Sequence, residues 1–269
     1  MTLRSIDERD AAPAAAVAAA RPGPGSGALV VLPTFQEATN VDTVLRRVRA
    51  ALPNAEVLVV DDASPDGTAD LAEDLAGELG GIEVLRRPAK AGLASAYCDG
   101  MRWAAGRGYE YVVAMDADLS HDPARLPVML AFAGAGADLV IGSRYVPGGA
   151  TTGWSPGRRA LSRWGNRYAR VVLALPVFDA TSGYRVYRAD ALAKIDLERL
   201  SARGFGFQVE MTRCMARVPG HIVEVPITFH DRAAGHSKMS SGIALEAWAL
   251  VTWWAVADRA PRRPERSWG

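Results

Sequence analysis

Two aspartates separated by one residue, Asp116 and Asp118, are the first candidates for chemistry in this sequence. They follow an apolar run, residues 110–115, that predicts a β-strand. On extended backbone this spacing places both side chains on one face, with Cα atoms roughly 7 Å apart. We expect the pair to face solvent and to hold one divalent cation, because Mg²⁺ and Mn²⁺ prefer oxygen ligands and keep waters and substrate phosphates.

Acidic residues follow two other predicted strands as well. Glu37 comes after the first strand, and Asp61 and Asp62 come after the second. Acidic residues are also common in loops and at helix N-termini, where they have no chemical role, so this alternative is considered for each of them. Asp122, which precedes a proline, is predicted to cap a helix. Asp66 is predicted to belong to a turn.

Arginines gather in the second half of the chain. Between residues 142 and 170 there are six arginines and no acidic residue, namely Arg144, Arg158, Arg159, Arg163, Arg167 and Arg170, with Trp154 and Trp164 among them. On a helix, the last four would form one stripe. A solvated helix face, bidentate phosphate binding and attraction to anionic lipid all fit. Nucleic acid is not expected, because the chain is nearly neutral and has no known binding motif.

Several common catalytic signatures are missing. No G-x-G-x-x-G or Walker pattern follows a predicted strand, and no H-E-x-x-H motif occurs. A dinucleotide dehydrogenase and a P-loop nucleotidase are therefore disfavoured. Cys98 is interpreted as a small packed helix residue. The four histidines are interpreted as surface or core-edge residues: His121, His221, His230 and His236.

The elements that must position these side chains form a mostly parallel sheet. Short runs of Val, Ile and Leu alternate with helix-like segments, which is typical of β-α-β units with strands covered on both faces. The predicted strands are Ala28–Leu32, Glu56–Val60, Ile82–Arg86, Glu110–Met115 and Asp138–Ile141. Ligands bind beyond the carboxyl ends of such strands, which is where the acidic residues lie.

Three helices are predicted between these strands. One follows Asn40, a candidate N-cap, and a second begins near Ser64 and Pro65. A third runs through about Ala94–Gly106. After Gly142 strands become sparse, and we interpret the second half as an extension built on the edge of a Rossmann-like sheet.

Composition places the chain among soluble globular proteins. Of 269 residues, 49% are hydrophobic and 23% charged, with a net charge of +1. We predict a disordered tail over residues 1–26, one folded domain over 27–258 and a basic tail over 259–269. Two cysteines exclude a disulfide framework and indicate a reducing, cytoplasmic location. The apolar segment Ile243–Ala257 has 15 residues, fewer than the roughly 20 that span a bilayer.

Eight short motifs occur in the order seen in one enzyme family, and the resemblance that they carry covers roughly Ala28–Lys238. They are Pro33-Thr-Phe-x-Glu37, Asp61-Asp-x-Ser-Pro-Asp-Gly-Thr68, Lys90-x-Gly-Leu93, Asp116-Ala-Asp-Leu-Ser-His121, Gly142-Ser-Arg-Tyr145, Thr181-Ser-Gly-Tyr-Arg185, Glu224-Val-Pro-Ile227 and Arg232-x-x-Gly-x-Ser-Lys238. The chain thereby resembles the dolichol-phosphate mannosyltransferases, or polyprenol-monophosphomannose synthases. The resemblance implies the GT-A fold of family-two glycosyltransferases, an α/β fold with a Rossmann-like, mostly parallel sheet flanked by helices and an acceptor-side extension.

The resemblance also implies a reaction, the inverting transfer of mannose from GDP-mannose to a polyprenyl phosphate with Mg²⁺ or Mn²⁺ on the diphosphate. Carried over motif by motif, the donor nucleotide would contact Pro33, Phe35, Glu37, Val60, Asp62, Asp116, Ala117, Asp118, Arg232 and Lys238. The acceptor phosphate would contact Arg144, Arg158 and Arg159. The implied catalytic set is Asp118, Arg144, Arg232 and Lys238.

The sequence departs from the family pattern at two of these positions. Phe35 stands where Tyr is common, which removes a hydroxyl group. Ser120 stands where some relatives use Gln as a metal ligand, so the candidate metal ligands are Asp116, Asp118 and Ser120. Relatives often carry C-terminal membrane helices, and none is expected here.

The implied chemistry agrees with the residue inventory. A phosphate monoester has a second pKa of about 6, so the acceptor is largely dianionic at neutral pH and needs no catalytic base. The protein must instead compensate charge, through a divalent cation on the leaving diphosphate and through Arg and Lys on the acceptor. A glycoside hydrolase would need a dedicated acid and base, and would leave the arginines unexplained.

Two alternative functions and the cellular location remain open at this point. A UDP-glucose-dependent polyprenyl-phosphate glucosyltransferase would share these motifs, and an inactive membrane-surface binding protein would share the fold. We expect peripheral binding to the inner face of the cytoplasmic membrane through the arginine stripe and Ile243–Ala257, which contains Trp248, Trp253 and Trp254. The alternative is that this segment is buried core. A membrane partner protein also stays open.

Overall fold

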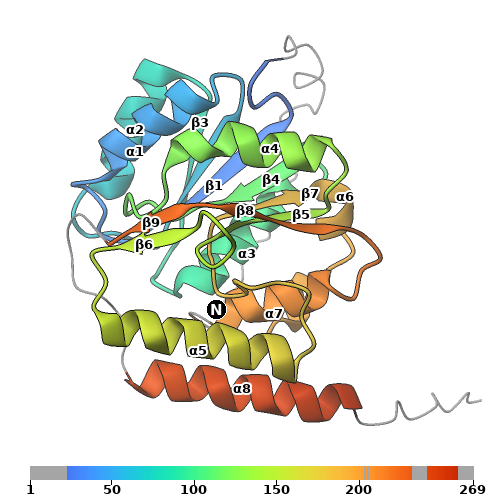
Figure 1. The fold of residues 1–269 in the computed structure, drawn as a ribbon. Coiled ribbons are helices and arrows are strands. Elements are labelled where there is room, and N and C mark those ends of the chain that lie inside the picture. The colour runs from blue at the N-terminus through green and yellow to red at the C-terminus, as the bar shows by residue number, and fades with distance from the viewer. Residues whose placement is uncertain (1–22, 203, 205, 232–240, 260–269) are drawn as a thin grey trace, which may run out of the picture.

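The computed structural model describes residues 23–202, 204, 206–231 and 241–259, and its centre is a seven-stranded sheet (Figure 1). The strand order is β3-β2-β1-β4-β7-β5-β8. The strands are β1 (Ala28–Thr34), β2 (Glu56–Asp61), β3 (Ile82–Arg86), β4 (Tyr111–Ala114), β5 (Leu139–Ser143), β7 (Arg185–Arg188) and β8 (Ile222–Pro226). Only β7 runs antiparallel to its neighbours in this sheet, so the prediction of a mostly parallel sheet is confirmed.

Helices cover both faces of the sheet. They are α1 (Val41–Ala51), α2 (Thr68–Leu79), α3 (Leu93–Ala104), α4 (Leu126–Gly134), α5 (Pro156–Val172), α6 (Ala189–Leu192), α7 (Gly206–Met215) and α8 (Ser241–Arg259), with 3₁₀ turns η3 (Pro123–Arg125) and η4 (Leu197–Arg199). In β1, Val30 and Leu32 join the core under α1, α2 and α4. Leu29 and Val31 join the core formed with α3 and α7 on the other face. These two cores explain why the strands read as continuous apolar runs.

One predicted helix start and one predicted helix cap need correction. Helix α2 begins at Thr68 and not at Ser64, because the Ser64 hydroxyl and amide both donate to the Asp61 carboxylate at the end of β2. Gly67 then takes a positive φ of 82° at the N-cap position. Asn40 does precede α1, but its amide donates to Glu37 instead of capping the helix.

The second half of the chain adds strands that the sequence did not indicate. Strands β7 and β8 extend the main sheet, and β6 (Ala150–Thr152) pairs with β9 (Thr228–His230) as a separate two-stranded ribbon. Strand β7 escaped prediction because it contains Arg185, which is fully buried. The guanidinium donates to the carbonyls of Ser182 and Ala180, so this charge is hydrogen-bonded within the core.

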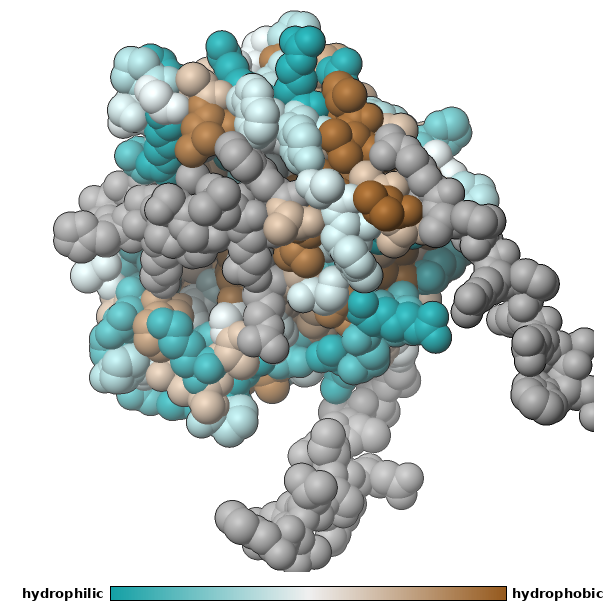
Figure 2. All heavy atoms as spheres, turned by 90° about the horizontal axis from the view of Figure 1, so that it is seen from below, coloured by the Kyte–Doolittle hydropathy of each residue, from teal (hydrophilic) through white to brown (hydrophobic). Residues whose placement is uncertain are grey.

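Helix α8 lies beside α5 and against α7, at the bottom of Figure 1. Val251 and Trp254 are buried in the core shared with α7, so the expectation that Trp254 lies at a membrane interface is wrong. Trp253 and Val256 are 61% and 64% exposed. Seen from below, the molecule shows hydrophobic and hydrophilic residues intermixed (Figure 2). The side chain of Trp248 lies outside the described residues. Across the described ranges, no helix combines the length and the apolar character needed to cross a bilayer.

The described part of the chain begins at residue 23, within the predicted tail over residues 1–26. Residues 23–26 form a turn in which the Ser26 amide donates to the carbonyl of Gly23. The carbonyl of Pro24 accepts from the Asn54 amide, which ties this turn to the segment after α1. The predicted tails over 1–22 and 260–269 lie outside the described residues.

Candidate active site

The Asp116 and Asp118 carboxylates lie beyond β4, in a turn at the carboxyl edge of the sheet. The expectation of a solvent-facing strand end is wrong for Asp118, which is only 5% exposed and accepts from the Ser120 amide at 3.0 Å. Leu119, which separates Asp118 from Ser120, takes a positive φ of 62°, and this turns the chain back on itself. Asp116 accepts from the Tyr97 hydroxyl at 2.8 Å. Both acidic residues are thus held in place by the surrounding fold.

The donor set at this turn fits a hard divalent cation. Two carboxylates stand beside the Ser120 hydroxyl, which is buried and has no hydrogen-bond partner among the described residues. A cation that also takes phosphate oxygens and waters needs only one or two carboxylates from the protein. Within the same residues, no three His, Cys, Asp or Glu side chains gather closely enough to hold a metal by themselves.

His121 is a core residue, which corrects the prediction of a surface or core-edge position. It is 1% exposed, and its Nδ1 accepts from the Asp116 amide at 3.3 Å. Its ring packs on Tyr184 and against Phe229, with centroids 4.9 and 5.3 Å away. Burial lowers the pKa of His121, so the neutral ring that can accept this bond is favoured. This hydrogen bond ties His121 to the Asp116 backbone.

The residues expected to hold the nucleoside lie at the ends of β1 and β2. Pro33 and Val60 pair in register and are buried. Asp62 forms an ion pair with Arg87 and accepts from the amides of residues 91 and 92, so it organises the loop after β3. The Lys90 ammonium on that loop lies 3.7 Å from the Phe35 ring centroid.

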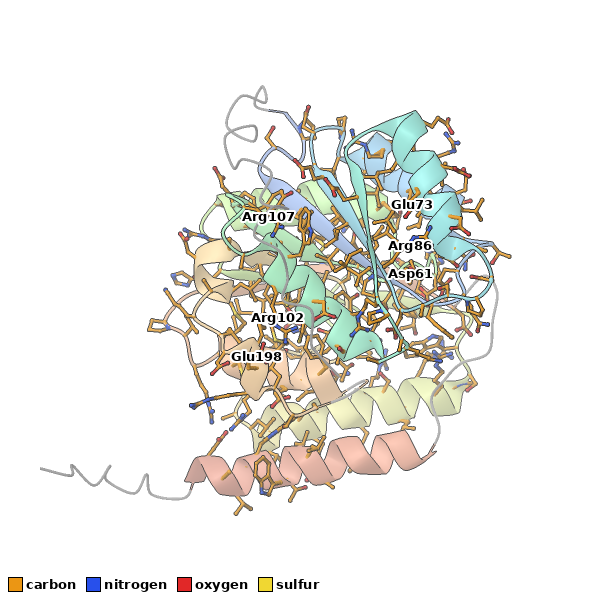
Figure 3. All side chains as sticks on the ribbon, turned by 180° about the vertical axis from the view of Figure 1, so that it is seen from behind. Asp61, Glu73, Arg86, Arg102, Arg107 and Glu198 are labelled. Atoms are coloured by element: carbon orange, nitrogen blue, oxygen red, sulfur yellow. The ribbon has the colours of Figure 1, made fainter. Side chains whose placement is uncertain are left out.

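Other predicted assignments near this edge are also resolved. Asp66 accepts from the Thr68 hydroxyl and from the amide of residue 38, which confirms its turn role. Asp122 accepts from the amide of residue 124 at the start of η3, which confirms its capping role. Burial raises the pKa of the Cys98 thiol to about 11, in keeping with a packed residue. On the outer side of β3, Arg86 and Glu73 form a surface ion pair (Figure 3).

Arg144 is already paired inside the protein. Its Nε and Nη2 donate to the two Asp179 carboxylate oxygens at 2.7 and 2.6 Å, and Nη2 also donates to Thr181. Burial by itself would raise the pKa of Asp179, but the Arg144 guanidinium holds that pKa below its usual range. Burial by itself would lower the pKa of Arg144. The negative charge of Asp179, with a smaller contribution from Asp116, outweighs burial, so the pKa of Arg144 is raised. The guanidinium lies 5.4 Å from the Phe229 ring, which packs against His121 next to the acidic turn, and Arg144 also lines a groove with arginines of α5.

Helix α5 begins beside the two-stranded ribbon. Although Gly153–Gly157 has the G-x-S-x-G pattern of serine hydrolases, the Ser155 hydroxyl accepts from the Arg158 amide and serves as the N-cap. Arg158 pairs with Asp231 at 2.9 Å and lies over the Trp154 ring. Arg159 is exposed. The structure therefore gives the two arginines expected at the acceptor phosphate different surroundings.

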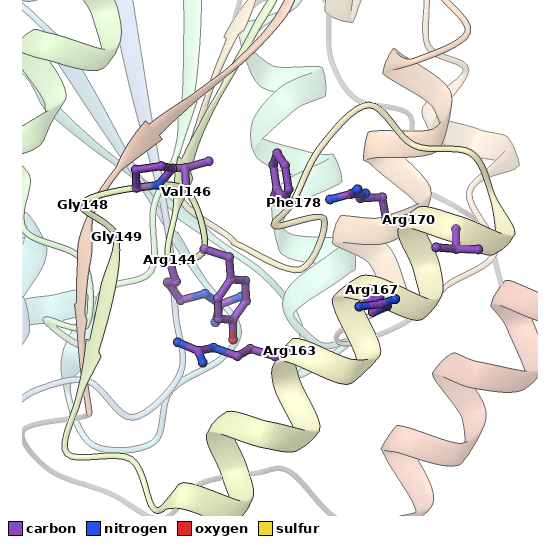
Figure 4. Close-up of a pocket in the computed structure, with 11 residues that line it drawn as sticks. Arg144, Val146, Gly148, Gly149, Arg163, Arg167, Arg170 and Phe178 are labelled. Atoms are coloured by element: carbon purple, nitrogen blue, oxygen red, sulfur yellow. The ribbon is translucent and has the colours of Figure 1, made fainter.

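A basic groove of about 720 Å³ separates α5 from the segment after β5 (Figure 4). Three members of the predicted arginine stripe, Arg163, Arg167 and Arg170, line one side, and Arg144 lines the other. Phe178 lies at one end with the Arg170 guanidinium 4.3 Å from its ring centroid. The helical stripe is confirmed, and it faces a groove that could accept an anionic group. Arg232 and Lys238 lie outside the described residues, and their roles stay predictions.

Three buried residues near this edge were not identified from the sequence. Tyr97 and Asp179 hold Asp116 and Arg144, and Gln208 on α7 comes close to Asp116 across Gly183. Their contacts join segments far apart in the chain. The available signal was polar character within apolar surroundings, which alone does not point to a site.

The family model of Glycosyl transferase family 2 matches residues 29–196. The undecaprenyl-phosphate mannosyltransferase of Micrococcus luteus is 50% identical over 231 residues, covering 86% of this chain and 95% of its own. The polyprenol monophosphomannose synthase of Mycolicibacterium smegmatis is 44% identical over 240 residues, covering 89% and 91%.

Solved structures resemble the chain in fold. One is the glucosyl-3-phosphoglycerate synthase of Mycobacterium tuberculosis in complex with Mn²⁺, UDP-glucose and phosphoglyceric acid. It superposes with a TM-score of 0.59 at 19% identity, covering 87% of this chain and 80% of that chain.

Proposed function

The chain belongs to glycosyl transferase family 2 and is a glycosyltransferase with the GT-A fold, and from this premise we propose that it transfers mannose from GDP-mannose to a polyprenyl monophosphate. The observation that carries the proposal is the juxtaposition of the Asp116–Asp118 turn with the arginine groove: the Phe229 ring packs against His121, next to this turn, and lies 5.4 Å from the Arg144 guanidinium of the groove. The acidic turn suits a cation-bound diphosphate, and the arginine groove suits a second phosphate. The names of the two curated relatives support a mannosyl donor and a polyprenyl-phosphate acceptor.

On the donor side, Asp116, Asp118 and the Ser120 hydroxyl would hold Mg²⁺ or Mn²⁺. When bound, the cation supplies Lewis-acid stabilisation to the departing nucleoside diphosphate. Tyr97 fixes one Asp116 oxygen, and His121 fixes the Asp116 backbone. This preorganisation reduces the reorganisation needed as charge develops on the leaving group.

The nucleoside would lie along the ends of β1 and β2. Phe35 offers a ring face there, and Asp62 holds the loop that carries Lys90 beside it. The uncharged Phe35 side chain supports stacking rather than hydrogen bonding to a base. Arg232 and Lys238 remain proposed contacts to the donor phosphates.

On the acceptor side, the groove arginines would bind the polyprenyl phosphate. Guanidinium groups suit phosphate oxygens because they donate in a planar, bidentate fork. The dianionic acceptor attacks the sugar carbon directly, and the protein positions it on the face opposite the leaving diphosphate. Inversion follows from that single displacement.

A lipid-linked acceptor requires the active site to approach a bilayer. We therefore propose peripheral binding at the inner face of the cytoplasmic membrane, through α5 and the exposed side of α8. Exposed Trp164, Trp253 and Val256 on these helices suit the interfacial zone. A membrane partner protein could deliver the acceptor to the same groove.

The test is product identification with the purified chain. GDP-mannose and UDP-glucose are each incubated with a short polyprenyl phosphate. One set of reactions contains Mg²⁺ or Mn²⁺, and a parallel set contains EDTA instead. We expect polyprenyl-phosphate mannose by mass spectrometry, formed only with GDP-mannose and only when the cation is present. A glucosyl product would replace the proposal by the UDP-glucose alternative, and the absence of turnover with every donor would favour an inactive binding protein.

A further inference from the structure

Gln208 carries an unexplained polar group into the buried region behind the acidic turn. Its side chain is 4% exposed, yet neither amide atom, Oε1 nor Nε2, has a hydrogen-bond partner in the part of the chain that the structure describes. Other buried polar residues of α7 are paired, since Glu210 accepts from Ser201 and the Thr212 hydroxyl donates to backbone carbonyls. Buried amides in folded proteins are normally satisfied, so an unpaired one calls for an external partner.

The position of Gln208 connects it to the donor site. A Cβ atom at Gly183 would lie 3.6 Å from Gln208 Nε2 and 3.5 Å from Asp116 Oδ2. The amide and the carboxylate therefore border the same small space, which the lack of a side chain at Gly183 leaves open. Phe207, the residue before Gln208, stacks its ring on Tyr97, whose hydroxyl donates to Asp116. The Gln208 backbone is thus anchored beside the acidic turn.

The pairing capacity of the amide selects the chemistry of its partner. A cation would engage only Oε1, and a phosphate would engage only Nε2, and each would leave one buried atom unpaired. Hydroxyl groups both donate and accept, so neighbouring sugar hydroxyls can satisfy both atoms together. The unpaired amide therefore matches a carbohydrate better than it matches a metal or a phosphate.

The order of the strands indicates which sugar of the donor this is. The nucleoside residues lie at β1 and β2, Asp116 follows β4, and Gly183 precedes β7, the next strand in the sheet. Moving in this direction along a sugar nucleotide leads from the nucleoside through the diphosphate to the hexose. Resting on the proposed function, we propose that Gln208 hydrogen-bonds the hydroxyls of the transferred hexose and contributes to the choice of sugar.

The test compares Gln208→Met with Thr212→Val, a buried change one turn further along α7. Each variant is assayed with GDP-mannose and with a series of singly deoxygenated GDP-mannoses, and binding of GDP alone is measured by calorimetry. For Gln208→Met we expect kcat/KM with GDP-mannose to fall about 10- to 100-fold, because a site that hydrogen-bonds a hydroxyl loses that contact. The Kd for GDP should stay unchanged, because GDP has no hexose.

The deoxygenated donors identify the contact. The deoxygenation that most weakens the wild type should cause no further loss in Gln208→Met, whereas Thr212→Val should keep the wild-type order of donors. The Tm of Gln208→Met should not fall, because an unpaired buried amide is replaced by an apolar side chain of similar shape. Thr212→Val should lower the Tm, because it removes hydrogen bonds made within the protein.

Two results would overturn the inference. One is wild-type kcat/KM in Gln208→Met, and the other is an equal loss for all donors together with weaker GDP binding, which would mean that the amide only supports the local structure. A wild type that uses UDP-glucose and not GDP-mannose would instead overturn the proposed function. The same comparison of sugar nucleotide with bare nucleotide, made with that donor, would then still decide the role of Gln208.

Discussion

Two aspartates of one motif have different surroundings, and this difference suggests different tasks. Asp116 accepts from Tyr97, whose pKa is raised well above its ordinary value by burial and by the Asp116 charge. The phenol therefore stays protonated at neutral pH and keeps donating. Asp118 is buried and accepts from a backbone amide within its own turn. Asp116 is aligned from another helix, whereas Asp118 is aligned by the turn itself.

The carboxylate charge of Asp118 should matter more for turnover than for stability. Asp118→Asn keeps the size of the side chain and an oxygen that can accept from Ser120, but removes the charge that a divalent cation requires. We expect turnover to fall by about 100-fold or more, since charge stabilisation by a bound cation contributes several kcal/mol. Steady-state assays would measure the loss of turnover, a Mn²⁺ titration would measure the loss of cation binding, and the Tm would show whether stability is kept.

Asp122→Asn is the matched control for this change. Asp122 lies four residues further on, where it caps η3 and pairs with Arg47 at the surface. Its loss should lower the Tm slightly and leave turnover unaffected. Undiminished turnover of Asp118→Asn, or activity of the wild type in EDTA, would contradict the metal-binding role.

The Arg144–Asp179 pair should give the protein a pH-dependent stability. Because Arg144 holds the folded-state pKa of Asp179 below the value of about 3.9 of an unfolded chain, the pair stabilises the fold above that pH. This stability is lost as pH falls through the lower, folded-state pKa. Asp179→Asn leaves a buried guanidinium without its counter-charge and should cost about 3–5 kcal/mol at pH 7.

Urea unfolding of the wild type and Asp179→Asn at a series of pH values measures this effect. The difference in unfolding free energy should be constant near neutral pH and should narrow as pH falls below about 4. A difference that is the same at all pH values would mean that Asp179 acts through shape or hydrogen bonding and not through its charge.

Among the elements, α5 presents its arginines to the groove, which gives a prediction for the acceptor. Arg163→Ala and Arg167→Ala should each raise KM for the polyprenyl phosphate several-fold, because each removes a charged donor from the proposed phosphate site. KM for GDP-mannose should not change. Arg199→Ala, which alters an exposed arginine on η4, is the control for net charge. Equal changes in both KM values would place these arginines elsewhere in the reaction.

Trp253 and Trp254 of α8 differ in burial, so substitutions at the two positions should behave differently. Trp254 is 1% exposed and lies near the Arg213 guanidinium of α7, so Trp254→Ala should destabilise the protein by about 3–5 kcal/mol. Trp253→Ala should change stability by much less, because this side chain is 61% exposed. Thermal unfolding of both variants measures this difference in stability. A similar Tm for the two would mean that α8 does not pack on α7 as described.

The sequence predicted the elements whose burial is simple. Strands β1, β2, β4 and β5 are covered on both faces, so their apolar runs were sufficient. Strand β7 was missed because Arg185 resembles a surface residue until the carbonyls that surround it are known. The start of α2 was placed early because Ser64 and Pro65 form a cap signal, whereas Ser64 is bound to Asp61.

The candidate site could be predicted only in its local part. Asp116, Asp118 and the arginine stripe were identified because each is a pattern of residue types at short spacing along the chain. Tyr97, Asp179 and Gln208 reach the same region from other elements, and only the topology brings them there. A polar residue within an apolar helix is ordinary until its neighbours show that it has no partner.

Across the whole molecule, a net charge of +1 conceals a separation of charge. Carboxylates occupy the turn after β4, and arginines of α5 line the groove together with Arg144, whose guanidinium shares the Phe229 ring with His121 next to the acidic turn. A phosphorylated acceptor would be attracted to one side, and a cation with its diphosphate to the other. The near-neutral total leaves the molecule without a strong overall field, so recognition depends on these two local regions.

The exposed side of α8 and the arginines of α5 lead to the prediction for membrane binding. Trp253 and Val256 project away from the core, and arginines favour anionic headgroups. The double variant Trp253→Ser, Val256→Ser should float less with anionic liposomes than the wild type. Its Tm and its turnover of a short, water-soluble acceptor should be unchanged, because neither side chain is buried. Binding should weaken at high salt and with neutral lipid. If the double variant floats as well as the wild type, the lipid acceptor is reached through another surface or delivered by a partner protein.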